Sequence, residues 1–148
     1  MKLKDIIRCV GINPHYVNSD SQRRALDAYY RCNNMYRGGM ANAYVYIPYT
    51  EEVKAVFDDS PQCFADSFNV HGGIDFINIV TKISDYHCPY SAILTDEQYN
   101  SKYVLLGWDT NHCDDNPDSW TYKTIIEENE RLARQVLDAI NSNKNIKH

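Results

Sequence analysis

The sequence predicts a single α+β domain in which an antiparallel sheet packs against a long C-terminal helix and N-terminal helices. Three observations support this fold class. The runs 43–47 and 102–108 are rich in β-branched and aromatic residues, as buried strands are. Apolar residues at helical spacing follow between 125 and 140. The 148 residues, a length typical of one domain, contain no repeat and no interdomain linker.

The first 40 residues are expected to form a helical N-terminal segment. The apolar residues of 3–10 have the i, i+3, i+4, i+7 spacing of a short amphipathic helix, and Gly11 follows as its C-cap. A second helix is predicted from about residue 22 to residue 36, after N-cap candidates at 19–21. Its expected apolar face consists of Ala25, Leu26, Tyr29, Tyr30 and Tyr36.

This second helix carries the chain's one concentration of basic side chains. They are Arg23, Arg24, Arg31 and Arg37. Two interpretations stay open. The arginines form a solvated helix face, or Arg31 and Arg37 belong to a phosphate-facing patch with aromatic neighbours.

Residues 41–143 are expected to hold the sheet and the remaining helices. Strands are predicted at 43–47, 68–70, 74–80 and 102–108. Thr50 should cap a short helix that the segment from Asp58 to Pro61 ends, and Thr95 should cap a single helical turn.

The last helix gives the clearest pattern in the sequence. Ser119 or Thr121 should cap it, and Glu127 and Arg131 have the spacing of a favourable ion pair on its polar face. We expect the helix to fray from Asn141, which leaves 144–148 as a frayed tail.

Composition limits the classes of partner and the compartment. The formal net charge of −5 argues against a duplex-DNA binder, and no apolar run approaches the roughly 20 residues that span a membrane. Five scattered cysteines, without a Cys-x-x-Cys motif, indicate neither a secreted disulfide framework nor a zinc ribbon. The charged N-terminal segment is no signal peptide, so we expect a reducing cytoplasm. The 12 tyrosines suit either a Tyr-rich sheet or a surface for base stacking.

The candidate site lies where the strand 102–108 ends. Asp109, His112 and Asp115 follow at three-residue spacing, next to Trp108 and Asn111. A carboxylate beside a histidine favours acid–base catalysis, and the same groups could hold a divalent metal ion. Asp and Asn are also common turn formers after a strand, so a structural Asx-turn stays open.

A second junction is expected to complete this site. In His71-Gly72-Gly73 the paired glycines let the backbone turn sharply or approach a ligand closely, and exposed N–H groups could bind phosphate. His71 would join Asp109, His112 and Asp115 as catalytic or metal-binding residues. Gly72, Gly73 and the nearby Asp75 would contact the ligand. A plain hairpin bend is the competing interpretation.

Both junctions resemble a family of small, phage-encoded proteins. The resemblance rests on 70–76, 107–115, the strand 44–48 and the helix 128–136. In that family the first motif usually reads His-Gly-Gly-Leu/Ile-Thr-Tyr/Phe and the second Gly-Phe-Asp-x-Ala-His-Ala-Gly-Asp. Asp75, Asn111 and Cys113-Asp114 depart from these patterns. The resemblance implies a phage or prophage origin and a counter-defence role.

Together with what this resemblance implies, the patterns lead us to expect a phage-type counter-defence protein in the cytoplasm of an infected bacterial host. It would recognise a phosphate-bearing small molecule, such as a cyclic nucleotide immune signal, and a phosphodiesterase-type hydrolysis stays open. One alternative is a non-catalytic nucleotide sponge. Another is a protein-binding inhibitor of a host defence effector such as a CRISPR nuclease. The sequence leaves homo-oligomerisation open.

Overall fold

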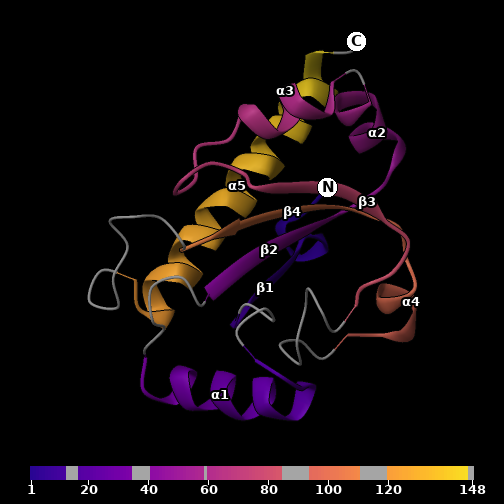
Figure 1. Cartoon of the computed structure of the whole chain (residues 1–148). Helices are drawn as coiled ribbons and strands as arrows, with labels where there is room; N and C mark the ends of the chain where they lie inside the picture. Colours follow the sequence, from indigo (N-terminus) through magenta and orange to yellow (C-terminus); the bar gives the residue numbers. More distant parts are fainter. Residues whose placement is uncertain (13–16, 35–40, 59, 85–93, 111–119, 147–148) are drawn as a thin grey trace.

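A computed structural model describes residues 1–12, 17–34, 41–58, 60–84, 94–110 and 120–146 of the chain. Its elements are η1 (Leu3–Asp5), β1 (Ile7–Ile12), α1 (Asp20–Cys32), β2 (Ala41–Pro48), α2 (Glu51–Phe57), α3 (Pro61–Asp66), β3 (Phe76–Val80), α4 (Asp96–Tyr99), β4 (Tyr103–Asp109) and α5 (Tyr122–Ile146). Four antiparallel strands form one sheet in the order β1-β2-β4-β3, and α5 runs along one of its faces (Figure 1). The predicted α+β fold class is therefore confirmed.

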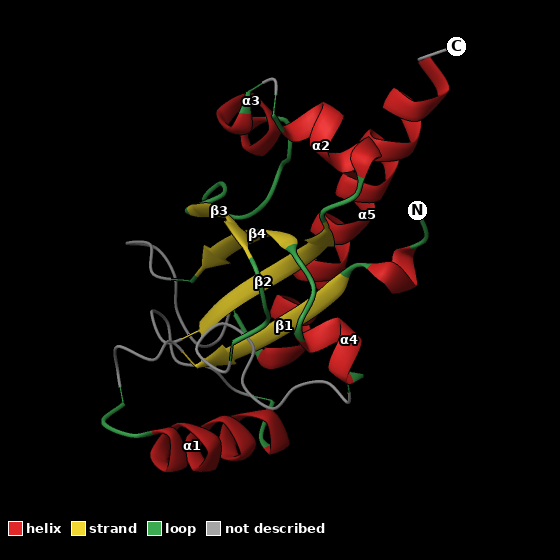
Figure 2. Cartoon of the chain, turned by 90° about the vertical axis from the view of Figure 1, so that its right-hand side faces the viewer, coloured by secondary structure: helices red, strands yellow, loops and turns green. Residues whose placement is uncertain are grey.

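The sheet separates a large core from a small one, and α5 lies behind the strands in Figure 2. Alternate residues of β2 and β4, such as Val45 and Leu106, face the large core, which α5 covers. The residues between them, such as Tyr46 and Leu105, face the smaller core on the other side. The central strands are thus buried on both faces, which explains their nearly continuous apolar sequence.

The first strand replaces the helix expected at 3–10. Ile7 to Ile12 pair in register with Tyr46 to Ala41, and Gly11 lies inside the strand. A strand that is buried on both faces has no apolar–polar alternation, so its periodicity could not be distinguished from that of a helix. The expectation of an entirely helical 1–40 segment is therefore wrong.

The expected strand at 68–70 is also wrong, and helix α3 comes before this segment. The Oγ of Ser60 accepts a hydrogen bond from the backbone N–H of Cys63, and Pro61 occupies the first turn. Helix α2 ends at Phe57, before the segment from Asp58 to Pro61, as predicted. Pro61 then begins α3, because its missing N–H is not needed in the first turn of a helix.

The predicted N-cap residues of the other helices are largely confirmed. The side chains of Ser19, Thr50 and Thr95 cap α1, α2 and α4, as their positions predicted. In α5, Thr121 Oγ1 accepts from the Thr124 N–H at 3.3 Å, while Ser119 lies outside the described residues. The expected fraying from Asn141 is wrong in extent, because α5 continues to Ile146.

The buried face of α1 differs from the predicted apolar stripe. Arg23, Asp27 and Tyr30 are buried, whereas Ala25 is exposed and Tyr29 has 58% of its surface exposed. The interpretation of the arginines as a solvated face is therefore wrong for Arg23. Charged side chains that are buried in a core need partners there, a requirement that periodicity alone does not reveal.

Cysteine chemistry also differs from expectation at one position. Cys9, in the smaller core, is disulfide-bonded, whereas Cys32 and Cys63 are exposed free thiols. A disulfide at Cys9 is not what the predicted reducing cytoplasm would lead us to expect.

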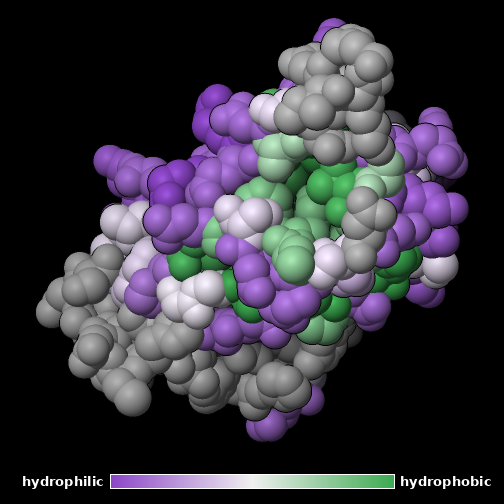
Figure 3. Space-filling model, turned by 90° about the horizontal axis from the view of Figure 1, so that it is seen from above, coloured by the Kyte–Doolittle hydropathy of each residue, from purple (hydrophilic) through white to green (hydrophobic). Residues whose placement is uncertain are grey.

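The end of the molecule that carries α2 and α3 shows an apolar hollow with a hydrophilic rim (Figure 3). Phe57 packs edge to face against Phe64, with ring centroids 5.7 Å apart, and Phe64 packs in the same way against Phe68, at 5.0 Å. These aromatic contacts join the two short helices to the large core.

Candidate functional site

The turn at His71 to Gly73 is fixed by the last helix. The backbone N–H of Gly73 donates to the Val70 carbonyl at 2.9 Å, and Gly72 and Gly73 have φ angles of 70° and 82°. Residues with side chains rarely adopt this left-handed region, which explains both glycines. The Glu128 Oε2 of α5 accepts the His71 N–H at 2.8 Å.

A second contact from α5 holds the residue that precedes this turn. The backbone N–H of Asn69 donates to Gln135 Oε1, and Gln135 Nε2 donates to the Asn69 carbonyl, both at 2.8 Å. Both backbone groups of Asn69 are therefore satisfied by one amide side chain, as they would be by a neighbouring strand. The loop 69–72 is positioned against α5 without being a strand.

Three aromatic rings meet beside this loop. The His71 ring lies 4.3 Å from Trp120 and 6.3 Å from Trp108, centroid to centroid, and the two indoles are 5.7 Å apart. Trp108 is buried, and its Nε1 donates to Asn129 Oδ1 at 3.0 Å. His71 and Trp120 are half-buried. The buried indole thus supports two rings that solvent still reaches.

A groove of about 610 Å³ lies between loop 69–72 and α5. Its wall consists of Asn69, Val70, His71, Gly72, Trp120, Thr124, Glu127, Glu128 and Arg131. This volume is in the range of small-molecule sites, which combine aromatic walls with a few polar groups.

Glu128 and Arg131 form the main charged contact of the groove. Arg131 Nε and Nη2 donate to the two carboxylate oxygens of Glu128 at 2.7 and 2.9 Å. This pair with Arg131, and then the His71 N–H, lower the pKa of the Glu128 carboxyl, against desolvation that raises it. The same contact raises the pKa of Arg131.

Replacing Glu128 with glutamine should remove part of the acid sensitivity of the fold. Because folding lowers the pKa of Glu128, its contribution is present above its ordinary pKa of 4.5 and is lost as the pH falls through the folded value. Urea unfolding should therefore find wild type more stable than Glu128→Gln at neutral pH and the difference smaller in acid. Glu127→Gln is the control, because Glu127 is 62% exposed. A difference that does not change with pH would contradict this account.

The sequence-predicted residues are only partly brought together. His71 and Gly72 line the groove, and Trp108 lies behind it. Asp109 follows Trp108, is half-buried and pairs with Asn42 at the end of β4. His112, Asp115, Asn111 and Arg37 lie outside the described residues.

The remaining candidates do not line this groove. Gly73 closes the turn, and Asp75 is exposed, with its backbone N–H donating to the Gly107 carbonyl at 2.9 Å. Arg31 lies on α1, where its Nε is 3.1 Å from Asp27 Oδ2. Within the described parts of the chain, no group of three or more His, Cys, Asp and Glu side chains is arranged to hold a metal ion.

Sequence reasoning missed Trp120, Glu128 and Arg131 as groove residues. The pattern on α5 predicted an ion pair of Glu127 with Arg131, but Arg131 contacts Glu128, and Glu127 is 4.0 Å from Lys123. Glu127 and Glu128 lie four and three residues before Arg131, so the sequence alone does not tell which of them pairs with it. The contact that distinguishes Glu128 is the hydrogen bond from the His71 N–H, which lies 57 residues away in the chain.

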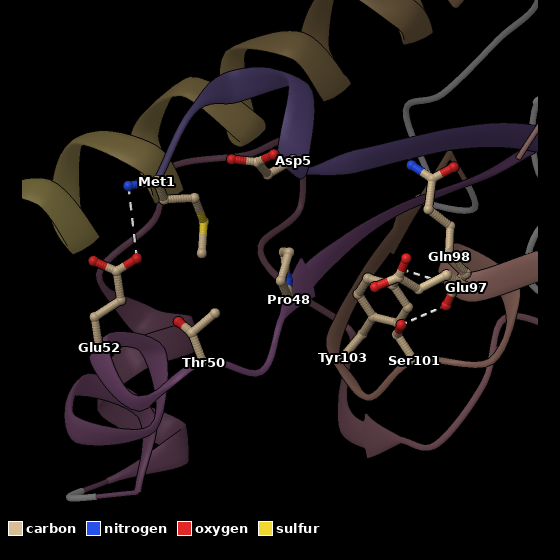
Figure 4. A pocket seen from close by; sticks show the side chains of 9 residues that line it. All are labelled: Met1, Asp5, Pro48, Thr50, Glu52, Glu97, Gln98, Ser101 and Tyr103. Atoms are coloured by element: carbon tan, nitrogen blue, oxygen red, sulfur yellow. Dashed lines mark hydrogen bonds and ion pairs between the residues drawn. The ribbon is translucent and has the colours of Figure 1, made fainter. Parts of the chain in front are cut away.

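A second cavity, of about 300 Å³, lies near the N-terminus (Figure 4). Its wall consists of Met1, Asp5, Pro48, Thr50, Glu52, Glu97, Gln98, Ser101 and Tyr103. The Met1 amine is 3.6 Å from Glu52 Oε1, and the Tyr103 hydroxyl donates to the Gln98 carbonyl. Several polar groups of this wall are thus engaged with one another, whereas the groove at His71 combines solvent-accessible aromatic rings with charged side chains.

The fold and the groove together define an α+β protein with an aromatic-walled site between loop 69–72 and its last helix. No helix in the described ranges is long and apolar enough to cross a membrane. No family model matches the chain, and searches of curated proteins and of solved structures found no similar protein. Its function must therefore be inferred from the site.

Proposed function

We propose that this protein binds a nucleotide in the groove at His71 and acts as a phage-type counter-defence protein that withdraws a nucleotide signal in the host cytoplasm. The observation that carries the proposal is the pair of half-buried rings, His71 and Trp120, with centroids 4.3 Å apart in the groove wall. Any of the nucleobases can stack on an aromatic side chain, because each has a flat π-face, and such stacking contributes about 1–3 kcal/mol per base.

The groove also supplies hydrogen-bond acceptors suited to a base. Glu127 lines the same wall, is 62% exposed, and approaches Lys123 no closer than 4.0 Å. A carboxylate accepts hydrogen bonds from the amino groups of bases, as acidic side chains do from cytosine in DNA. Stacking together with an acceptor therefore supports recognition of a nucleobase.

Binding, rather than hydrolysis, is the activity that we propose. Of the four predicted catalytic residues, His71 and Asp109 lie in the described ranges, and His71 packs its ring against Trp120. An imidazole in aromatic contact with an indole, at an interplanar angle of 47°, suits a binding wall. Hydrolysis of the bound nucleotide is a separate hypothesis that the same experiment tests.

Tryptophan fluorescence gives a direct test, because the chain contains two tryptophans and both belong to the aromatic cluster. Purified protein is titrated with cyclic mono- and dinucleotides of adenine and guanine, with and without Mg²⁺, and equilibrium dialysis repeats the measurement independently of optical absorption. We expect saturable binding that changes the emission. Trp120→Leu should weaken it about tenfold to hundredfold. Tyr29→Leu, an exposed aromatic position outside the groove, should leave it unchanged.

The fate of the nucleotide separates the two modes of action. Recovery of intact nucleotide after denaturation supports a sponge, whereas chromatography that finds a linear product supports hydrolysis. No binding of any nucleotide would contradict the proposal and would favour a host protein as the partner. Equal binding by wild type and Trp120→Leu would place the site elsewhere.

A further inference from the structure

We propose that Arg131 recognises the phosphate of the nucleotide, so that the ligand is a nucleoside phosphate and not a free nucleoside. This inference rests on the proposed function. Arg131 lines the same groove as His71 and Trp120, and its side chain is 48% exposed. The groove thus presents an aromatic wall for a base and a permanently charged guanidinium for an anion.

The hydrogen-bond donors of Arg131 are only partly used within the described residues. A guanidinium has five N–H donors. Glu128 takes one from Nε and one from Nη2, at 2.7 and 2.9 Å. The Nη1 donors and the second Nη2 donor remain, and they form the end of the fork. Two parallel N–H groups in this arrangement match two phosphate oxygens.

Glu128 fixes the direction in which this fork points. One oxygen of its carboxylate accepts from Arg131 Nε, and the other accepts from both Arg131 Nη2 and the His71 N–H. The carboxylate is therefore held from α5 and from loop 69–72 together. An arginine that is oriented before binding loses less conformational entropy when a phosphate arrives.

The charges around the groove predict a modest and salt-sensitive phosphate contribution. Glu128 balances the charge of Arg131. Glu127, the second carboxylate of the wall, is exposed and lies 4.0 Å from Lys123, at the limit of an ion pair. The remaining attraction comes from directed hydrogen bonds more than from net charge. We expect the phosphate to tighten binding about tenfold at low salt and less at high salt.

The test compares adenosine and guanosine with their monophosphates by tryptophan fluorescence and equilibrium dialysis. Wild type should bind each monophosphate about tenfold more tightly than its nucleoside. Arg131→Gln should lose the preference for the monophosphate, because the guanidinium is gone and the Glu128 carboxylate is no longer balanced. Arg131→Lys should lose most of the preference because lysine lacks the fork. Arg134→Gln, an exposed arginine on the same helix outside the groove, is the matched control and should behave as wild type.

The outcomes distinguish this inference from the proposed function. If wild type binds nucleoside and monophosphate equally, Arg131 is not a phosphate contact, but nucleotide recognition through the base stands. A preference that persists in Arg131→Gln overturns the inference in the same way. If neither compound binds, the proposed function itself fails. Circular dichroism of each variant checks that the fold is retained.

Discussion

Asn129→Leu is expected to lower the free energy of unfolding by about 2–5 kcal/mol. Asn129 is 1% exposed on α5, and its amide joins the helix to the sheet at two points. Its Oδ1 accepts from Trp108 Nε1 at 3.0 Å, and its Nδ2 donates to the Tyr44 carbonyl at 3.1 Å. Leucine would leave the buried Trp108 indole N–H without its acceptor and would remove one donor from the Tyr44 carbonyl. Each lost buried contact should cost about 1–3 kcal/mol.

A double-mutant cycle separates this loss from a simple change of shape. Trp108→Phe removes the indole N–H, so that Asn129→Leu in that background removes one hydrogen bond instead of two. Urea unfolding should then show a coupling of about 1–2 kcal/mol between the two positions. Arg134→Leu, an exposed substitution on the same helix, should change stability by less than about 0.5 kcal/mol. Strict additivity would mean that the indole–amide bond does not contribute.

The contact of Asn129 also bears on the groove. The Trp108 indole contacts the His71 and Trp120 rings edge to face. If the loss of Asn129 displaces this indole, the wall that we assign to the base should change as well. Asn129→Leu should therefore weaken nucleotide binding as well as stability, although Asn129 is not in the groove wall. This makes it a positioning residue, which acts through Trp108.

The fold class could be predicted because it depends on local patterns. The β-branched and aromatic runs of β2 and β4 and the apolar stripe of α5 survive in the structure with shifts of a few residues at their ends. β1 could not be distinguished from a helix, because a strand buried on both faces has no alternation. Pro61 illustrates a second difficulty, since proline either ends a helix or begins one.

The site was partly predictable for a related reason. The glycines of the His71 turn and the end of β4 are local signals, and the structure places His71 beside Trp108. Nothing in the local sequence marks Glu128 and Arg131, in α5, or Trp120, just before it, as residues of a site. They become groove residues through long-range contacts such as the one between Glu128 and the His71 backbone. No local pattern encodes such a contact.

The ion pair on α1 should also be important for stability. Asp27 is fully buried, its Oδ2 lies 3.1 Å from Arg31 Nε, and Arg23 is 3% exposed on the same face of the helix. Arg23 also acts on the smaller core: burial is the main cause that raises the pKa of Tyr46, and the charge of Arg23 opposes that rise. We expect Asp27→Ala to lower the free energy of unfolding by about 3–5 kcal/mol, because it removes the buried carboxylate of the ion pair with Arg31.

The chain contains a matched control for this prediction. Lys123 and Glu127 on α5 have the same i,i+4 spacing, but they are 75% and 62% exposed and 4.0 Å apart. Glu127→Ala should therefore change stability by less than about 0.5 kcal/mol in urea unfolding. Asp27→Asn, which keeps the shape and an acceptor, should lie between the two. If Asp27→Ala and Glu127→Ala cost equally little, water must reach the charges of α1, and the helix would present the solvated basic face that its sequence also allows.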